Sequence, residues 1–264
     1  MNTIILKTSL FLLFLMSLSP ENAYKEEIEK INTETSYEKT LEINEVNEFF
    51  IEKLDNKLED KKITCLGDSI TYGNGGSYKE DGTQISYCDY LADILDAEVV
   101  NLGIGGTAIG DYWDENSFIL RWNKIPEDSD IIIIYGGLND YFIGNYGDIN
   151  AKEEKTFTGD CYKLFSNIKN TYTNSKIYVI LNYQTDYENI EQFKNNDLEK
   201  YLMTEKQYAE EFGFEIIDLY HLNFLNSKDM TLNKAYIPDG VHPNDEGNKI
   251  LANEIATKLL IDAQ

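Results

Sequence analysis

From residue 61 onward, short apolar segments alternate with longer segments in which apolar residues recur at helical spacing. The short segments predict five strands, at residues 63–66, 98–102, 130–135, 176–181 and 214–219. Residues 131–134 are four consecutive isoleucines, which is typical of a parallel strand covered on both faces. The regular alternation predicts a doubly wound α/β fold with a parallel sheet.

Several of the longer segments predict amphipathic helices. One apolar stripe comprises Phe157, Cys161, Leu164, Phe165, Ile168 and Tyr172, and another comprises Ile190, Phe193, Leu198, Tyr201, Leu202, Tyr208 and Phe212. A final helix is predicted to open at Pro243, with Asp245 and Glu246 in its first turn, where acidic side chains complement the helix dipole.

The start of the chain predicts an export signal over residues 1–23. An apolar run at residues 10–16 follows Lys7 and is shorter than the roughly 20 residues that span a bilayer. Ala23 is the candidate cleavage site, and a retained N-terminal anchor is the alternative. The mature protein is therefore expected outside the cytoplasm, secreted or in the cell envelope, with no stable membrane span.

Residues 24–60 predict an acidic linker and an N-terminal helix ahead of the main domain, residues 61–264. The linker is expected to be solvated through about Thr40. Beyond it, Ile43, Val46, Phe50 and Leu54 recur at helical spacing and predict a helix that docks on the domain. The segment carries no catalytic motif, so a variant that begins near Glu42 is expected to fold and to keep the activity of the full mature chain.

Composition narrows the function classes. The 264 residues include 47 acidic and 23 basic side chains, a formal charge of −24, which argues against a nucleic-acid partner. The three cysteines give no complete disulfide framework. Cys65 and Cys161 fall on predicted core positions, and no Cys/His cluster has the spacing of metal ligands, so no metal site is predicted.

Ser69 is the candidate nucleophile, in the sequence Gly67-Asp68-Ser69-Ile70 directly after the first predicted strand. Ligands of open parallel sheets bind at the carboxyl ends of strands, where Ser69 is expected to lie. A serine hydroxyl becomes nucleophilic at neutral pH when a base lies within hydrogen-bond reach. A serine at this place more commonly caps a helix, so the assignment depends on its partners.

The chain has two histidines, which makes the base easy to shortlist. His242 follows Asp239 by three residues across a turn that contains Gly240, so the carboxylate can meet the imidazole Nδ1 and leave Nε2 for Ser69. His221 follows Asp218 at the end of the fifth strand and is the competitor. We predict that His242 is the base and that Asp239 orients it.

Three groups are candidate oxyanion donors for ester hydrolysis: the Ser69 backbone N–H, Gly106 and the side-chain amide of Asn139. Gly106 lies in a glycine-rich turn after the second strand, where Gly103 and Gly105 compete for the same role. Such donors stabilise the negative charge of a tetrahedral intermediate.

A strand order of 2-1-3-4-5 would make these three loops neighbours. Asp239 and His242 follow the fifth strand, roughly 15 Å from the first. Residues 220–238 can cross that gap, since an extended chain covers up to ~3.3 Å per residue.

The chain resembles the SGNH (GDSL-type) hydrolase family. Four segments carry the resemblance: residues 67–69, 101–106, 137–140 and 239–242. It covers about residues 61–260 and implies a flavodoxin-like three-layer α/β/α fold with a five-stranded parallel sheet. By position, Ser69 matches the nucleophile, Gly106 and Asn139 the oxyanion residues, His242 the base and Asp239 its partner. The Gly-x-Ser-x-Gly elbow of α/β-hydrolases is absent.

The resemblance implies an esterase that needs no cofactor, acting on a small ester or an acetylated carbohydrate. We predict a secreted carbohydrate O-acetyl esterase. The alternatives are a lysophospholipase or short-chain lipase-like esterase, and a catalytically inactive surface binding module of the same fold. Tyr72, Tyr141 and Tyr183 are expected in rim loops, where they could stack on a sugar.

Overall fold

The computed structural model describes residues 18–112, 115–193 and 196–264. A five-stranded sheet has the order β2-β1-β3-β4-β5, and every neighbouring pair is parallel. The strands are β1 (Lys62–Gly67), β2 (Glu98–Gly103), β3 (Ile131–Tyr135), β4 (Lys176–Leu181) and β5 (Glu215–Asp218). The predicted fold class and strand order are confirmed, and each strand lies within about one residue of its predicted bounds.

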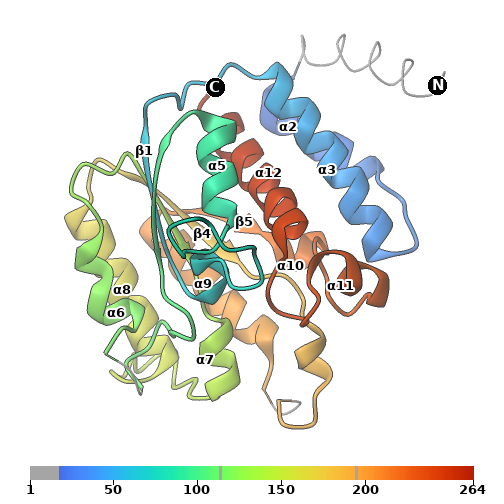
Figure 1. The fold of residues 1–264 in the computed structure, drawn as a ribbon. Coiled ribbons are helices and arrows are strands. Elements are labelled where there is room, and N and C mark those ends of the chain that lie inside the picture. The colour runs from blue at the N-terminus through green and yellow to red at the C-terminus, as the bar shows by residue number, and fades with distance from the viewer. Residues whose placement is uncertain (1–17, 113–114, 194–195) are drawn as a thin grey trace, which may run out of the picture.

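Helices cover both faces of the sheet, giving three layers (Figure 1). One face carries α2 (Pro20–Lys30), α3 (Ser36–Lys53), α5 (Tyr87–Leu95), α11 (Met230–Tyr236) and α12 (Asp245–Asp262). The other face carries α6 (Phe118–Arg121), η1 (Trp122–Lys124), α8 (Phe157–Thr171) and α9 (Leu198–Phe212). Four short elements follow strand ends or loops: α4 (Ser69–Tyr72), α7 (Leu138–Ile143), η2 (Asp186–Asn189) and α10 (Leu219–Leu222).

The isoleucine strand explains the two cores. Side chains alternate between the faces of a strand, so Ile131 and Ile133 join the core beneath α3, α5 and α12, whereas Ile132 and Ile134 join the core beneath α6, α8 and α9. All four are at most 5% exposed. The three cysteines are buried and have free thiols.

Two predicted helices differ from the structure. The final helix starts at Asp245 after an Asn244 cap, two residues later than Pro243. The predicted stripe that began at Ile190 is helical only from Leu198, because Asp197 caps the helix by accepting the N–H of Lys200.

The expectation of a solvated linker through Thr40 is wrong. Helix α2 is capped by Ser19 and begins at Pro20, and α3 begins at Ser36. Ala23 and Tyr24 are buried, and the Tyr24 hydroxyl donates to Glu254 on α12 at 2.8 Å. The candidate cleavage residue Ala23 therefore lies inside α2. Residues 1–17 of the predicted signal fall outside the described residues.

Candidate active site

The nucleophile turn forms directly after β1. The Asp68 side chain caps α4 by accepting the N–H of Ile70 at 3.0 Å. The residue that caps this helix is therefore Asp68, and the Ser69 hydroxyl is left for another partner. Ser69 is 7% exposed, at the carboxyl edge of the sheet.

The second turn brings His242 to Ser69 from 173 positions later in the chain. His242 Nε2 lies 2.9 Å from Ser69 Oγ, and His242 Nδ1 lies 2.7 Å from Asp239 Oδ2. The other Asp239 oxygen accepts the backbone N–H groups of Val241 and His242, at 2.9 and 2.7 Å. These bonds fix both the imidazole and the carboxylate, and the three predicted residues form one hydrogen-bonded chain.

The hydrogen bonds at this turn also set the protonation of Asp239. Desolvation raises the pKa of this carboxyl, but the hydrogen bonds from the His242 ring and from two backbone N–H groups outweigh it and lower the pKa to about 2. Asp239 is therefore a carboxylate across the working pH range and can stabilise a protonated His242.

His221 occupies a different place. Its Nδ1 lies 2.9 Å from Asp218 Oδ2, and its Nε2 lies 3.1 Å from Glu199. Both ring nitrogens face carboxylates of β5 and α9. Desolvation lowers the His221 pKa, and the hydrogen bonds to the two carboxylates raise it by more. This histidine has the same spacing to its aspartate as His242 but no contact with Ser69.

The glycine-rich turn after β2 runs past the nucleophile. The Gly103 N–H donates to Asn101 Oδ1 at 2.8 Å and is therefore occupied. A side chain on Gly105 would come within 4.0 Å of Ser69 Cβ, whereas one on Gly106 would meet no atom within 4 Å. Gly106 has φ +75°, the left-handed region that favours glycine. Gly106 stays the predicted donor, with Gly105 as its competitor.

Asn139 reaches the same region from the start of α7. Its Nδ2 donates to the Thr107 carbonyl at 2.9 Å and to Asp68 Oδ2 at 3.3 Å. The amide is thereby held between the nucleophile turn and the glycine-rich turn. Its role as an oxyanion donor stays a prediction, and it requires that one of these two N–H groups be shared with the oxyanion.

Arg121 is a structural residue of the site that sequence reasoning missed. Its guanidinium donates to the carbonyls of Leu102, near the end of β2, and of Gly67, at the end of β1, and also to Thr107 Oγ1. The side chain is buried, and it is the one arginine of the chain. Its rarity was the available signal, because arginine holds several acceptors in a fixed fork where lysine cannot.

Three buried carboxyl groups lie beneath these turns. Desolvation raises the pKa of Asp68 to about 6, against the opposing Ile70 hydrogen bond, and the pKa of Asp140 to about 7, against hydrogen bonds from Ile109, Gly110 and Tyr112. Desolvation also raises the pKa of Glu205 well above its usual range. A side chain on Gly137 would come 1.9 Å from Glu205 Oε1, so this carboxyl lies against the turn that precedes Asn139.

Two of the three predicted rim tyrosines are not on the rim. Tyr141 and Tyr183 are fully buried, and the Tyr183 hydroxyl donates to the Val241 carbonyl at 2.5 Å. Their prediction as sugar-stacking residues is wrong, because their rings fill the core and support the turns instead. Tyr72 is 41% exposed, and Tyr78, on the loop that follows α4, is 76% exposed.

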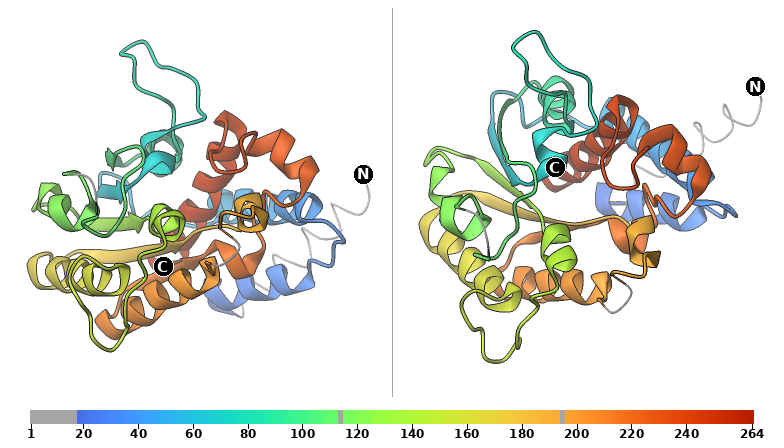
Figure 2. Two further views of the ribbon diagram at one scale, coloured as in Figure 1. Left: turned by 90° about the horizontal axis from the view of Figure 1, so that it is seen from below. Right: turned by 60° about the horizontal axis from the view of Figure 1, so that its bottom comes forward.

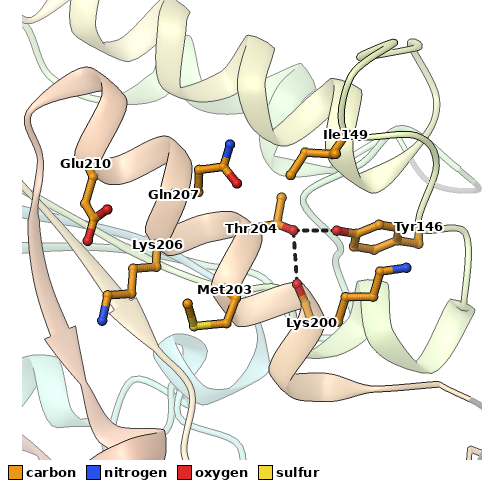
Figure 3. Close-up of a pocket in the computed structure, with 8 residues that line it drawn as sticks. All are labelled: Tyr146, Ile149, Lys200, Met203, Thr204, Lys206, Gln207 and Glu210. Carbon is orange, nitrogen blue, oxygen red and sulfur yellow. Dashed lines mark hydrogen bonds between the residues drawn. The ribbon is translucent and has the colours of Figure 1, made fainter.

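A surface pocket of about 290 Å³ lies on the outer face of α9 (Figure 3). The residues that line it are Tyr146, Ile149, Lys200, Met203, Thr204, Lys206, Gln207 and Glu210. None of them belongs to the Ser69 site.

Within the described ranges, no cluster of three His, Cys, Asp or Glu side chains is arranged to hold a metal ion. No helix in that part of the chain is long and apolar enough to cross a bilayer.

Comparison with known proteins assigns the family. Residues 65–250 match the model of the GDSL-like Lipase/Acylhydrolase family. The chain belongs to this family, and its membership supports an ester-hydrolysing enzyme. A solved structure from Lactobacillus plantarum is 26% identical in sequence and superposes with a TM-score of 0.66. The match covers 76% of this chain and 97% of the Lactobacillus plantarum chain.

Two further relatives carry functional names. An acetylxylan esterase from Geobacillus stearothermophilus superposes with a TM-score of 0.53 at 20% identity, covering 78% of this chain and 96% of its own. The N-acylneuraminate cytidylyltransferase of Escherichia coli is 32% identical over 175 residues, 65% of this chain. The match spans 38% of that relative's length.

Proposed function

We propose that this protein is a serine esterase that removes acetyl groups from carbohydrate outside the cytoplasm. The observation that carries the catalytic part is the hydrogen-bonded chain from Ser69 Oγ through the His242 ring to Asp239. These three hydrogen-bonded residues supply a nucleophile, a base and an orienting carboxylate at one edge of the sheet, which is the combination that acyl transfer requires.

In the proposed mechanism, Ser69 Oγ attacks the ester carbonyl carbon while His242 Nε2 accepts the hydroxyl proton. The resulting oxyanion is stabilised by the Ser69 N–H, the Gly106 N–H and the Asn139 amide. The intermediate collapses as His242 returns the proton to the leaving alcohol oxygen, which leaves an acyl group on Ser69. His242 then takes a proton from water as the water oxygen attacks the acyl carbonyl carbon. The second tetrahedral intermediate collapses as His242 returns this proton to Ser69 Oγ, which breaks the bond to the acyl group and releases the acid.

The carbohydrate part of the proposal is supported by the rim and by the relatives. Tyr72 ends α4, Tyr78 lies on the loop that follows it, and both expose aromatic rings of the kind that stack on sugars. An acetylxylan esterase shares the fold, and the relative from Escherichia coli is named for an N-acylated sugar acid. The apolar run near the N-terminus supports export.

A panel of esters tests the proposal. We expect turnover of p-nitrophenyl acetate to exceed that of butyrate and longer esters, and we expect acetate release from acetylated xylan oligosaccharides. Ser69→Ala should abolish both activities, and labelling by a fluorophosphonate, while leaving the melting temperature within a few degrees. A preference for long chains would favour a lipase-like esterase. Absence of both turnover and labelling in the wild-type protein would favour a binding module.

A further inference from the structure

Helix α3, near the N-terminus, contacts residues 223–229. These residues belong to the long segment that follows β5 and leads to the catalytic turn, residues 239–242. Both α2 and α3 precede residue 65, where the family match begins. Figure 1 shows α3 beside α11 and α12 on one side of the sheet. Its role is therefore not given by the family match.

Three hydrogen bonds join the first turns of α3 to residues 223–229. Ser36 Oγ donates to the Asn223 carbonyl at 3.1 Å, and the Tyr37 N–H donates to Asp229 at 3.0 Å. Thr40 Oγ1 accepts the Leu225 N–H at 3.1 Å. Thr40 and Leu225 are fully buried, so this last bond has no replacement from water.

The Thr40 bond holds a backbone conformation that leucine disfavours. Leu225 has φ +53°, and Asn223, two residues earlier, has φ +55°. Left-handed backbone is unfavourable for a bulky residue and persists where the surroundings over-determine it. Loss of the Thr40 hydroxyl would therefore favour relaxation of residues 223–229.

The same segment holds the catalytic turn directly. Ser227 Oγ donates to the Gly240 carbonyl at 2.7 Å, and Thr185 Oγ1 donates to the same carbonyl at 2.8 Å. Gly240 lies between Asp239 and His242 and has φ +83°. A side chain there would meet Asp186 at 2.1 Å, so the turn fits closely against its support.

We propose that α3 is a positioning element for catalysis: Thr40 fixes Leu225, the segment 223–229 fixes Gly240 through Ser227, and Gly240 fixes the imidazole of His242 against Ser69. The N-terminal extension is then needed for full turnover. A variant beginning at Glu42 lacks Ser36, Tyr37 and Thr40, so the expectation that it keeps full esterase activity is replaced by the opposite one. This inference rests on the proposed serine esterase function.

Two substitutions of the same kind separate positioning from stability. Thr40→Val removes the acceptor and preserves the shape. Thr257→Val is the matched control, because buried Thr257 also bonds to α3, donating to the Asn47 carbonyl at 3.3 Å, but from α12 and away from the turn. Turnover of p-nitrophenyl acetate is measured at a temperature where melts show both proteins fully folded.

We expect Thr40→Val to lower kcat roughly 10-fold with KM little changed, because a displaced imidazole loses alignment rather than substrate contact. The rate of fluorophosphonate labelling should fall in parallel. Thr257→Val should lower the melting temperature and keep the wild-type kcat, and Thr40→Ser should restore turnover. If Thr40→Val does not fold, Ser36→Ala at the same contact should show a smaller fall in kcat.

The inference is overturned if Thr40→Val, or Ser36→Ala in its place, turns over as fast as Thr257→Val. It is also overturned if Thr40→Ser is as slow as Thr40→Val. Ser69→Ala is measured alongside. Full activity of Ser69→Ala would refute the proposed function itself, whereas an inactive Ser69→Ala beside a fully active Thr40→Val would refute the positioning role alone.

Discussion

The two histidines of this chain show how one local pattern can have two outcomes. Both follow an aspartate by three residues and both bond to it through Nδ1. They differ in the partner of Nε2, which is Ser69 for His242 and Glu199 for His221. The choice is made by the segment that crosses the sheet, not by the spacing itself.

This difference gives a paired prediction. His242→Ala should lower kcat for p-nitrophenyl acetate by at least about 10³-fold, because the nucleophile loses its base. His221→Ala should keep wild-type kcat and change only stability, by about 1 kcal/mol or less for a partly exposed ion pair. Steady-state kinetics on both variants check this. An inactive His221→Ala beside an active His242→Ala would show that His221, and not His242, is the base.

Arg121 gives a second prediction at the scale of single residues. Its fork joins the ends of β1 and β2 to the glycine-rich turn, so Arg121→Lys keeps the charge but cannot make all of these bonds. We expect unfolding free energy to fall by about 2 kcal/mol, since buried hydrogen bonds to charged groups are strong. The kcat should fall at least ~10-fold, because the predicted oxyanion donors of the nucleophile turn and the glycine-rich turn would be displaced. A Lys variant with wild-type kcat in denaturant-free buffer would limit Arg121 to stability.

At the scale of elements, the strands and most helices could be predicted from the sequence, because their signal is local. Residues 131–134 read as a buried parallel strand, and the alternation of elements gave the layer order. Helix α2 could not be predicted in this way. It buries Ala23 and Tyr24, and the partners of the Tyr24 hydroxyl, Asn47 and Glu254, are distant in sequence.

The residues of the site also divide into those with a local sequence signal and those that depend on contacts distant in sequence. Ser69, Asp239 and His242 were predictable because each lies in a short motif at the end of an element. The burial of Tyr183 was not, because it depends on a bond to the Val241 carbonyl 58 positions away. Arg121 was missed for a similar reason, since most of its acceptors are backbone carbonyls, which leave no mark in the side-chain pattern.

The loop between α4 and α5 carries the next prediction. It projects from the body of the protein in both views of Figure 2. Its base lies against the catalytic turn, because a side chain on Gly75 would come 3.1 Å from His242 Cβ. Ser77 donates to Asp245 through its backbone N–H and its hydroxyl, at 2.7 and 2.6 Å, which anchors the loop to α12. Tyr78, the next residue, exposes its ring on this anchored loop.

We expect Tyr78→Ala to raise KM for acetylated xylan oligosaccharides about 3- to 10-fold, the range for one aromatic contact. The kinetics of p-nitrophenyl acetate should not change, because that ester lacks the sugar that would stack on the ring. Leu120→Ala, which removes a half-exposed apolar side chain on α6, is the control. Equal effects on both substrates would make Tyr78 a support of the loop rather than a sugar contact.

At the scale of the whole molecule, protonation links the site to stability. The raised pKa values of Asp68, Asp140 and Glu205 mean that the folded protein binds protons that the unfolded chain releases above about pH 4. Stability must therefore fall as pH rises from about 4 through 6 and 7. Asp239 acts in the opposite sense. Its pKa of about 2 means that its contribution is present above about pH 4 and is lost as pH falls toward 2.

The melting temperature should therefore peak near pH 4–5 and decline toward pH 8, which thermal melts at constant ionic strength would measure. The net charge of −24 acts in the same direction through self-repulsion, so the buried groups need their own test. Glu205→Gln keeps the shape but cannot ionise, and it should flatten the decline between pH 5 and 8. Glu45→Gln, at an exposed position of α3, removes the same charge and should leave the slope nearly unchanged. Equal slopes for the two variants would show that surface repulsion, rather than the buried carboxyl under the Asn139 turn, sets the pH dependence.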